Sequence, residues 1–314
     1  MTSYNKIFRS RETLKDPGFG NKDASKGGRF INKDGSFNIR QQGLPFFRSF
    51  SFYHYLITIS WFKFCVYILI SYLLINVFFA SLYLFTGIEK LDGTGGETAF
   101  QNFQDAFFFS TQTFTTVGYG RINPIGFSSN IIASLESLTG LLSAALATGL
   151  LYGRFSRPNA NIIFSDQAVI APYQDMTGFM FKIANARNNQ LINVEVQVAF
   201  TRVEKVQGLD VRKYFELNLE RTKIDFFSLS WTVVHPIDEN SPLWGISKEE
   251  LDNSDAEFLI LLKAFDDTFS QNVHTRSSYK FNEIAWNYKF VDAFKREDGI
   301  TILELDKIST IEKA

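Results

Sequence analysis

Two long apolar runs restrict what this chain can fold into more than any other feature of its sequence. Residues 64–85 read FCVYILISYLLINVFFASLYLF without a charge, and residues 131–152 read IIASLESLTGLLSAALATGLLY with one acid, Glu136. Each run covers about 22 residues, enough for a helix to cross a hydrocarbon core of about 30 Å. The alternative, a pair of core helices in a soluble protein, is disfavoured because such helices are rarely this long and uncharged.

A segment rich in Thr and Gly lies between the two runs. Residues 104–115 predict a helix of about three turns, too short to span a bilayer, and the sequence TVGYG follows at residues 116–120. Non-helical backbone at membrane depth is tolerated only where it lines a water- or ion-filled path. Gly118 and Gly120 can adopt positive φ, so that alternating residues turn successive carbonyls to one side. An ordinary glycine-rich turn is the alternative, which the flanking helix and spans disfavour.

Copies of this segment around one axis would form an ion-binding filter. Four copies would stack rings of carbonyl oxygens, with the Thr116 hydroxyl adding a lower ring, and such rings replace the hydration shell of K⁺. The helix before them would point its partially negative C-terminal end at the permeating cation. We therefore predict a K⁺ site and no organic cofactor, and the K⁺ site comprises Thr116, Val117, Gly118, Tyr119 and Gly120.

Charge and cysteine content indicate the orientation of the chain. The formal net charge of −1 gives no reason to expect a nucleic-acid partner, and the lone Cys65 excludes an intrachain disulfide. Basic residues outnumber acidic ones before residue 60, and Arg154 and Arg157 follow the second run, whereas the loop at 86–130 holds more acids than bases. The positive-inside rule therefore predicts a multi-pass membrane protein with both termini in the cytoplasm.

The first half of the chain has further parts around the two runs. Residues 1–44 are rich in Gly, Lys and Asp and predict a flexible cytoplasmic arm with one short strand. Residues 45–60 predict an amphipathic helix in the membrane interface, and Trp61 and Lys63 would anchor the first span. The membrane domain, residues 61–153, is then expected to comprise an outer helix at 61–86, a pore helix at 104–115, the filter at 116–120 and an inner helix at 128–153.

After a linker at 154–160 the pattern changes from apolar runs to alternation. LINVEVQVAF places Val194, Val196 and Val198 between polar residues, which is typical of a half-buried strand. Similar short runs recur towards the C-terminus, with turn signals such as QDMTG and REDG between them. Residues 161–314 therefore predict an all-β sandwich domain.

Several segments together resemble one known family. TFTTVGYG matches the potassium-channel signature at Thr113, Thr116, Gly118, Tyr119 and Gly120. Four further segments are similar to linker and cytoplasmic-domain segments of the inward-rectifier potassium channel (Kir) family: RFSRPNA at 154–160, NAR at 185–187, VVHPIDENSPLWGIS at 233–247 and RSSYKFNEIAWNYKF at 276–290. The short loops and the missing extracellular cysteine pair resemble a prokaryotic member.

The resemblance implies a fold and an activity. Each subunit would contribute an interfacial slide helix, two membrane-spanning helices with a pore helix between them, and a cytoplasmic immunoglobulin-like β-sandwich. It implies a homotetramer of the bacterial inner membrane that conducts K⁺ passively, gated at the inner-helix crossing and by the cytoplasmic domain. The alternative is a membrane-anchored receptor for a ligand or protein with a vestigial pore. A potassium uptake transporter subunit is a further alternative, but such chains carry several filter-like segments.

The resemblance also assigns roles along the inner helix. Tyr152 matches the constriction where four rings would close the pore, with an interfacial tyrosine as the alternative. Gly140 and Gly149 are candidate hinges, with close helix packing as the alternative for each. Ala144 occupies the cavity position that is acidic in strongly rectifying relatives, and Thr148, one turn further, is expected to face the cavity.

Three residues near the filter depart from the family or are unusual in a membrane. Gln112 replaces a Glu behind the filter, so the charged pair that braces the filter is expected to be absent. Arg121 follows the filter where many prokaryotic members have Asp. Glu136 is an acid within the second run, and we expect it to pair locally behind the filter.

The cytoplasmic pore shows departures of its own. Asn193 and Lys263 stand at positions that are acidic in strong rectifiers, and Glu195 and Asp267 can compensate in part. We therefore expect only weak block by polyamines and Mg²⁺.

Basic residues near the inner leaflet are expected to meet anionic lipid headgroups. They are Lys63, Arg154, Arg157 and, more distantly, Arg187. Simple positive-inside anchoring is the alternative, and the bases that would give specificity for phosphatidylinositol bisphosphate are missing.

Enzymatic chemistry is not expected. His54, His235 and His274 lack metal-ligand spacing, and His235 is expected to have a structural role. The sequence shows no grouping of a nucleophile with a base and no phosphate-binding loop.

Overall fold

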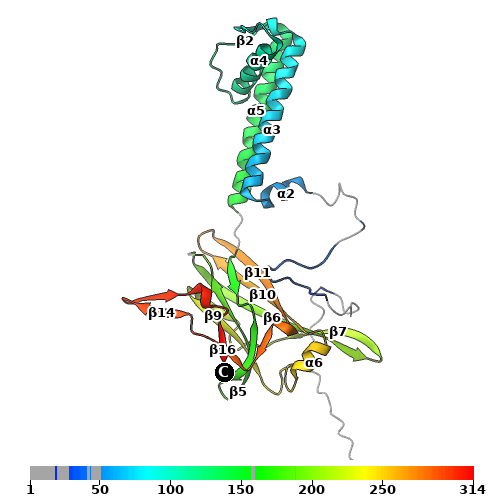
Figure 1. The fold of residues 1–314 in the computed structure, drawn as a ribbon, viewed down its shortest axis with the longest axis vertical. Helices are drawn as coiled ribbons and strands as arrows, with labels where there is room; N and C mark the ends of the chain where they lie inside the picture. The colour runs from blue at the N-terminus through cyan, green and yellow to red at the C-terminus, as the bar shows by residue number, and fades with distance from the viewer. Residues whose placement is uncertain (1–17, 20–27, 41–42, 44–50, 157–159, 188) are drawn as a thin grey trace, which may run out of the picture. The chain divides into compact units, whose positions relative to one another are not determined.

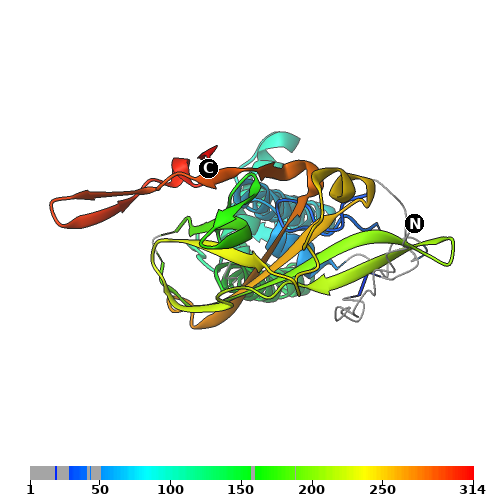
Figure 2. The same cartoon turned by 90° about the horizontal axis from the view of Figure 1, so that it is seen from below.

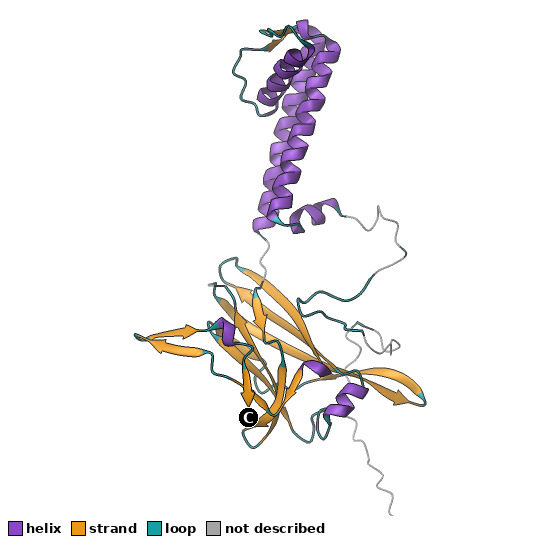
Figure 3. Cartoon of the chain, in the orientation of Figure 1, coloured by secondary structure: helices purple, strands orange, loops and turns teal. Residues whose placement is uncertain are grey.

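A computed structural model describes residues 18–19, 28–40, 43, 51–156, 160–187 and 189–314. The chain divides into two compact units, one of residues 43–157 and the other of residues 1–42 together with 158–314. The first is mostly helical and the second is mostly β-sheet, as Figure 3 shows. We refer to them as the helical unit and the β unit.

The described part of the helical unit holds four α-helices: α2 (Phe52–Thr58), α3 (Trp61–Thr86), α4 (Ala99–Phe114) and α5 (Gly126–Phe155). α3 has 26 residues and α5 has 30, and both are long and apolar enough to cross a membrane. The two long helices run side by side, and α4 packs against both of them at one end (Figure 1). The short strands β1 (Leu91–Asp92) and β2 (Asn123–Pro124) pair antiparallel and join the loops before and after α4.

The helices differ in their bounds from the predicted ones. α2 begins at Phe52 because the Ser51 side chain accepts a hydrogen bond from the His54 amide. It ends at Thr58, two residues before the predicted end at residue 60, and residues 45–50 of the predicted helix lie outside the described residues. α4 begins at Ala99 rather than at residue 104, because Thr98 and Gln101 form a capping box. α5 extends beyond the predicted 128–153 at both ends.

Two five-stranded sheets make up most of the β unit. One has the order β11 (Gln271–Lys280), β10 (Glu257–Asp266), β6 (Leu191–Val206) and β7 (Leu209–Glu216), with β8 (Lys223–Phe227) also paired to β6. The other has the order β12 (Ile284–Trp286), β4 (Ala168–Tyr173), β5 (Met176–Asn185) and β3 (Ile162–Phe164), with β9 (Ser230–Ile237) also paired to β5.

The two sheets face each other across one apolar core, so the predicted all-β sandwich is confirmed. Phe179 of β5 stacks on Phe258 of β10 with ring centroids 4.2 Å apart. The remaining elements lie around the sandwich, as the view in Figure 2 shows. They are α6 (Lys248–Asn253) and the two-stranded pairs β13 (Tyr288–Phe290) with β16 (Ile311–Lys313) and β14 (Phe294–Glu297) with β15 (Ile300–Leu303).

Residues 1–44 were predicted to be a flexible arm with one short strand, and the described part of this arm is packed against the sandwich. Glu257, at the start of β10, accepts hydrogen bonds from the backbone amides of Phe30 and Ile31. Burial raises the pKa of the Glu257 carboxyl, and the two amides act in the opposite direction. The order comes from partners far away in the sequence, which local composition does not reveal.

His235 has structural partners, as its sequence context predicted. One ring nitrogen lies 2.7 Å from the Asn218 carbonyl and the other 2.7 Å from the Ser241 hydroxyl. Burial lowers the pKa of the His235 imidazole, which keeps the ring neutral at physiological pH.

Candidate ion-conduction site

Residues 116–120 follow α4 directly, and their backbone alternates in handedness. φ is +59° at Thr116, +50° at Gly118 and +81° at Gly120, whereas the intervening Val117 and Tyr119 keep negative φ. The two glycines therefore have the positive φ that the sequence predicted.

This loop is joined to the last turns of α4 by the backbone. The amides of Val117 and Gly118 both donate to the Gln112 carbonyl, at 2.9 and 3.3 Å. The direction of α4 thus sets the position of Val117 and Gly118, the second and third residues of the predicted filter.

The positive φ of Thr116 was not predicted. A β-branched residue in this region is an outlier that costs about 1–3 kcal/mol, and such strain is found where function requires it. The potassium-channel signature includes a Thr at this position, but the local amino-acid composition does not predict that this Thr adopts a positive φ.

A charged pair holds the segment after the predicted filter. Arg121 Nη2 lies 3.0 Å from Asp105 Oδ1, and the Asn123 side-chain amide donates to the Gly120 carbonyl at 3.0 Å. The sequence around Arg121 did not predict this pair. Although Gln112 brings no charge behind the filter, a salt bridge between Arg121 and α4 braces the other end of this segment.

Glu136 of α5 forms the expected local pairing, at the place where α3, α4 and α5 meet. Its carboxylate accepts hydrogen bonds from the Tyr83 hydroxyl of α3, at 2.6 Å, and from the Ser110 hydroxyl of α4. The Ser110 oxygen also lies 3.1 Å from Asn76 Oδ1 of α3. All four side chains are buried, so this cluster fixes α4 against both long helices.

Gly140 lies against the carbonyl end of α4. A Cβ atom at this position would lie 2.0 Å from the Phe114 carbonyl oxygen, a backbone atom. The contact favours close packing over a hinge for Gly140. Gly149 has no atom within 4 Å of such a Cβ, so it lacks this constraint.

Replacing Gly140 by Ala is expected to displace α4 and the filter that follows it. Overpacking of a tight contact costs about 1–3 kcal/mol, and here the obstacle is backbone that leads directly into Thr116. We expect a lower thermal unfolding temperature and reduced ⁸⁶Rb⁺ uptake into liposomes. Gly149→Ala is the matched control and should retain the unfolding temperature of the parent. Equal unfolding temperatures and equal uptake for Gly140→Ala and the parent would contradict the packing role.

Ala144, Thr148 and Tyr152 lie at successive helical turns on one face of α5. All three are exposed in the single chain, and Tyr152 is 74% exposed. The Thr148 hydroxyl donates to the Ala144 carbonyl at 2.9 Å, as threonines in helices commonly do. The structure therefore brings the three predicted pore residues onto one continuous surface.

Arg154, a predicted contact for lipid headgroups, makes two hydrogen bonds within the helical unit. Its Nη1 and Nη2 atoms donate to the carbonyls of Leu56 and Ile59, at 2.6 and 2.7 Å. The guanidinium also lies over the rings of Trp61 and Phe64, 4.6 and 4.5 Å from their centroids. Arg154 thus ties the end of α5 to the end of α2 and the start of α3.

Replacing Arg154 by Lys is expected to loosen this junction although the charge is kept. An ammonium group cannot reach two carbonyls with the planar fork of a guanidinium. Loss of about 1 kcal/mol would lower the unfolding temperature by about 2–4 °C in a protein of this size, measurable by differential scanning fluorimetry in detergent. Lys63→Gln, at an exposed position of α3, should leave it unchanged. An unshifted unfolding temperature for Arg154→Lys would show that the two bonds contribute nothing.

The other predicted lipid-facing bases differ in what the structure says of them. Lys63 at the start of α3 and Arg187 after β5 are exposed. Arg157 lies outside the described residues.

Two of the four predicted cytoplasmic-pore residues, Glu195 and Lys263, lie opposite each other on the face of β6 and β10 that is turned away from the core. In the strand register, Glu195 stands opposite Lys263 of β10 on one side and Lys223 of β8 on the other. Lys263 stands opposite His274 of β11. Asn193 lies beside this row, at a bulge where φ is +52°.

Glu195 is therefore flanked by a lysine on each side. Neither lysine forms an ion pair with Glu195 among the described residues: Lys223 Nζ lies 3.6 Å from Asp225 Oδ1, and Glu195 Oε1 accepts from the Gln197 side-chain amide at 3.1 Å. Partial compensation by Glu195 stays a prediction. Asp267 is exposed just beyond the end of β10 and does not belong to the row.

Comparison with known proteins agrees with this architecture. The family model "Inward rectifier potassium channel C-terminal domain" matches residues 162–313, and the model "Ion channel" matches residues 46–156. Inward rectifier potassium channel Kirbac3.1 of Paramagnetospirillum magnetotacticum is 41% identical over 296 residues, which are 93% of this chain and 98% of that relative. G protein-activated inward rectifier potassium channel 3 of Mus musculus and of Homo sapiens are each 24% identical over 86% of this chain and 74% of the relative.

Two membrane-length helices around a short helix and its glycine-containing loop define a membrane protein of the ion-channel class. Within that class, the chain belongs to the inward-rectifier potassium channel family, as a prokaryotic member. The resemblance predicted from the filter sequence and the cytoplasmic segments is confirmed.

Proposed function

We propose that four copies of this chain form a K⁺-selective pore, with residues 116–120 as its filter. The observation that carries this proposal is the alternation of positive φ at Thr116, Gly118 and Gly120 directly after α4. A strand that alternates in handedness can direct successive carbonyls to one side, where rings of them replace the water around K⁺. Conduction is passive, down the electrochemical gradient.

The exposure of the filter in the single chain supports a closed assembly. Val117 is 53% exposed and Tyr119 is 80% exposed, although both follow a helix that packs between two apolar spans. Because one filter segment per chain cannot surround an ion, closed rotational symmetry must supply the others. The face with Ala144, Thr148 and Tyr152 then lines the path below the filter.

The gate in this proposal is Tyr152. Four of these rings at the crossing of the inner helices close the path by excluding water. Gly149, which has open space around it, is the candidate hinge that moves them. Arg154 connects this end of α5 to α2, so a movement of the interfacial helix reaches the gate.

The environment of the channel follows from charge. Both termini and the β unit lie in the cytoplasm. Exposed Lys63 and Arg187, together with Arg157, meet anionic headgroups of the bacterial inner membrane, whereas Arg154 acts through the junction that it forms. Polyamines and Mg²⁺ block weakly.

Uptake of ⁸⁶Rb⁺ into proteoliposomes loaded with K⁺ tests the proposal. We expect uptake that barium inhibits, that Na⁺ does not replace, and that changes with the fraction of anionic lipid. A membrane-anchored receptor with a vestigial pore would give the uptake of empty liposomes at every lipid composition.

A further inference from the structure

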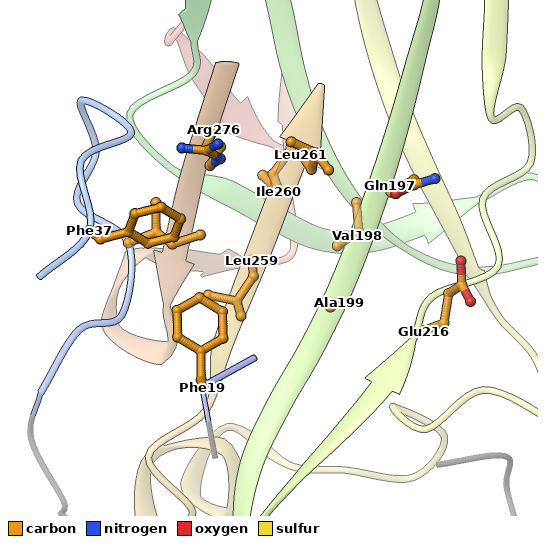
Figure 4. A pocket seen from close by; sticks show the side chains of 11 residues that line it. Phe19, Phe37, Gln197, Val198, Ala199, Glu216, Leu259, Ile260, Leu261 and Arg276 are labelled. Atoms are coloured by element: carbon orange, nitrogen blue, oxygen red, sulfur yellow. The ribbon is translucent and has the colours of Figure 1, made fainter. Parts of the chain in front are cut away.

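A cavity of about 280 Å³ lies in the β unit between the N-terminal arm and the outward face of the sheet. Figure 4 shows its two walls. Phe19 and Phe37 of the arm form one wall, and Ala199 of β6 with Leu259 and Leu261 of β10 form the other. The lining is mostly apolar, and its volume is just below the range of about 300–1,000 Å³ in which proteins bind small molecules.

Charge at the rim of this cavity is placed asymmetrically. The Arg276 guanidinium of β11 lies over the Phe37 ring, 4.7 Å from its centroid, and has no acidic partner within 4 Å among the described residues. Its side chain is half-buried, whereas Glu216 at the other side of the cavity is exposed. A half-buried charge is less screened by solvent than an exposed one. The cavity therefore favours an anion at the Arg276 end.

The arm wall of the cavity is anchored in place. Arg29 forms an ion pair with Glu283, and Glu257 accepts hydrogen bonds from the Phe30 and Ile31 amides. These contacts hold residues 29–31, which precede Phe37 in the chain, against the β unit. Phe19 packs on Phe30, with ring centroids 4.9 Å apart, and completes the aromatic side. A cavity with one anchored wall of this kind is formed before any ligand arrives.

We propose that this cavity binds a small amphipathic anion, with an aryl or short alkyl body between the arm and the sheet and a carboxylate on Arg276. The apolar body contacts the phenyl rings and Leu261, and the carboxylate accepts from the guanidinium fork. Such a ligand joins the arm to β6, β10 and β11. The proposal does not depend on conduction through the helical unit.

The test uses the full chain in lipid nanodiscs and three matched probes observed by ¹⁹F NMR. The probes are 4-(4-fluorophenyl)butyrate, the corresponding alcohol and the corresponding amine. We expect the carboxylate to bind about tenfold more tightly than the alcohol, as loss of one charge-assisted hydrogen-bonded pair implies, and the amine to bind more weakly still.

Two variants separate the site from nonspecific partitioning. Arg276→Gln keeps the cavity and should remove the preference for the carboxylate, whereas Ala199→Trp fills the cavity and should abolish binding of all three probes. Arg296→Gln, an exposed position on β14, is the matched control and should behave like the parent.

Three results would overturn the proposal. They are equal binding of the three probes, preference for the amine, and a carboxylate preference that survives Arg276→Gln. Absence of binding to the parent, together with a changed oligomeric state in Ala199→Trp, would instead identify a second copy of this chain as the occupant of the cavity.

Discussion

Gly118→Ala is expected to abolish ⁸⁶Rb⁺ uptake while the protein still assembles. Gly118 has φ of +50°, and a left-handed conformation costs an L-residue about 1–2 kcal/mol that glycine does not incur. No atom lies within 4 Å of the added Cβ in the chain, so the penalty is conformational. Relief of it requires the peptide to rotate, which removes a carbonyl from the filter in every copy at once.

Assembly of the chains should be unaffected, because the change in backbone conformation is confined to residues 116–120, which follow α4. Size-exclusion chromatography with light scattering should give the same mass for the variant and the parent. Gly95→Ala is the matched control, since Gly95 also has open space for a Cβ but no positive φ, and its uptake should equal that of the parent. Selective uptake by Gly118→Ala at the rate of the parent would refute residues 116–120 as the filter.

The parts of the fold that were predictable from the sequence are those with strong local signals. The two long helices follow from uncharged apolar runs, and the sandwich follows from alternation such as that of Val194, Val196 and Val198. The first signal is the length of an uncharged run, and the second is a period of two residues along the chain. The start of α4 was placed too late because the capping pair Thr98 and Gln101 lies outside the apolar segment that was counted as helix.

The features that sequence did not predict depend on contacts between distant residues. Arg154 stands where lipid-binding bases are expected, and only the position of the Leu56 and Ile59 carbonyls shows that its Nη1 and Nη2 atoms have partners within the chain. The arm residues Phe30 and Ile31 are ordered by Glu257, more than two hundred positions further along the chain. Gly140 becomes a packing residue only because the Phe114 carbonyl lies against it.

The second large expected effect concerns rectification, the voltage-dependent block of the pore by cytoplasmic cations. Ala144 offers no charge to a blocker in the cavity, and Lys263 and Lys223 flank Glu195 in the cytoplasmic row. A multivalent cation such as spermine is therefore attracted neither on entering the β unit nor on reaching the cavity. We expect weak, shallow block of the parent in planar bilayers.

Ala144→Asp should convert this into steep, voltage-dependent block. By the proposed symmetry the substitution places four carboxylates around one water-filled cavity. Even in water, two unit charges at 4 Å attract by about 1 kcal/mol, so four such attractions strengthen spermine binding roughly a thousandfold. In the control Ala144→Asn the side chain has nearly the shape of Asp without its charge, so spermine should block this variant as weakly as it blocks the parent. If the parent already rectifies as steeply as Ala144→Asp, the blocker binds outside the cavity. Glu195→Gln and Asp267→Asn would then locate the binding site. Weaker block of these two variants than of the parent would show that the acids of the β unit attract the cation despite the neighbouring lysines.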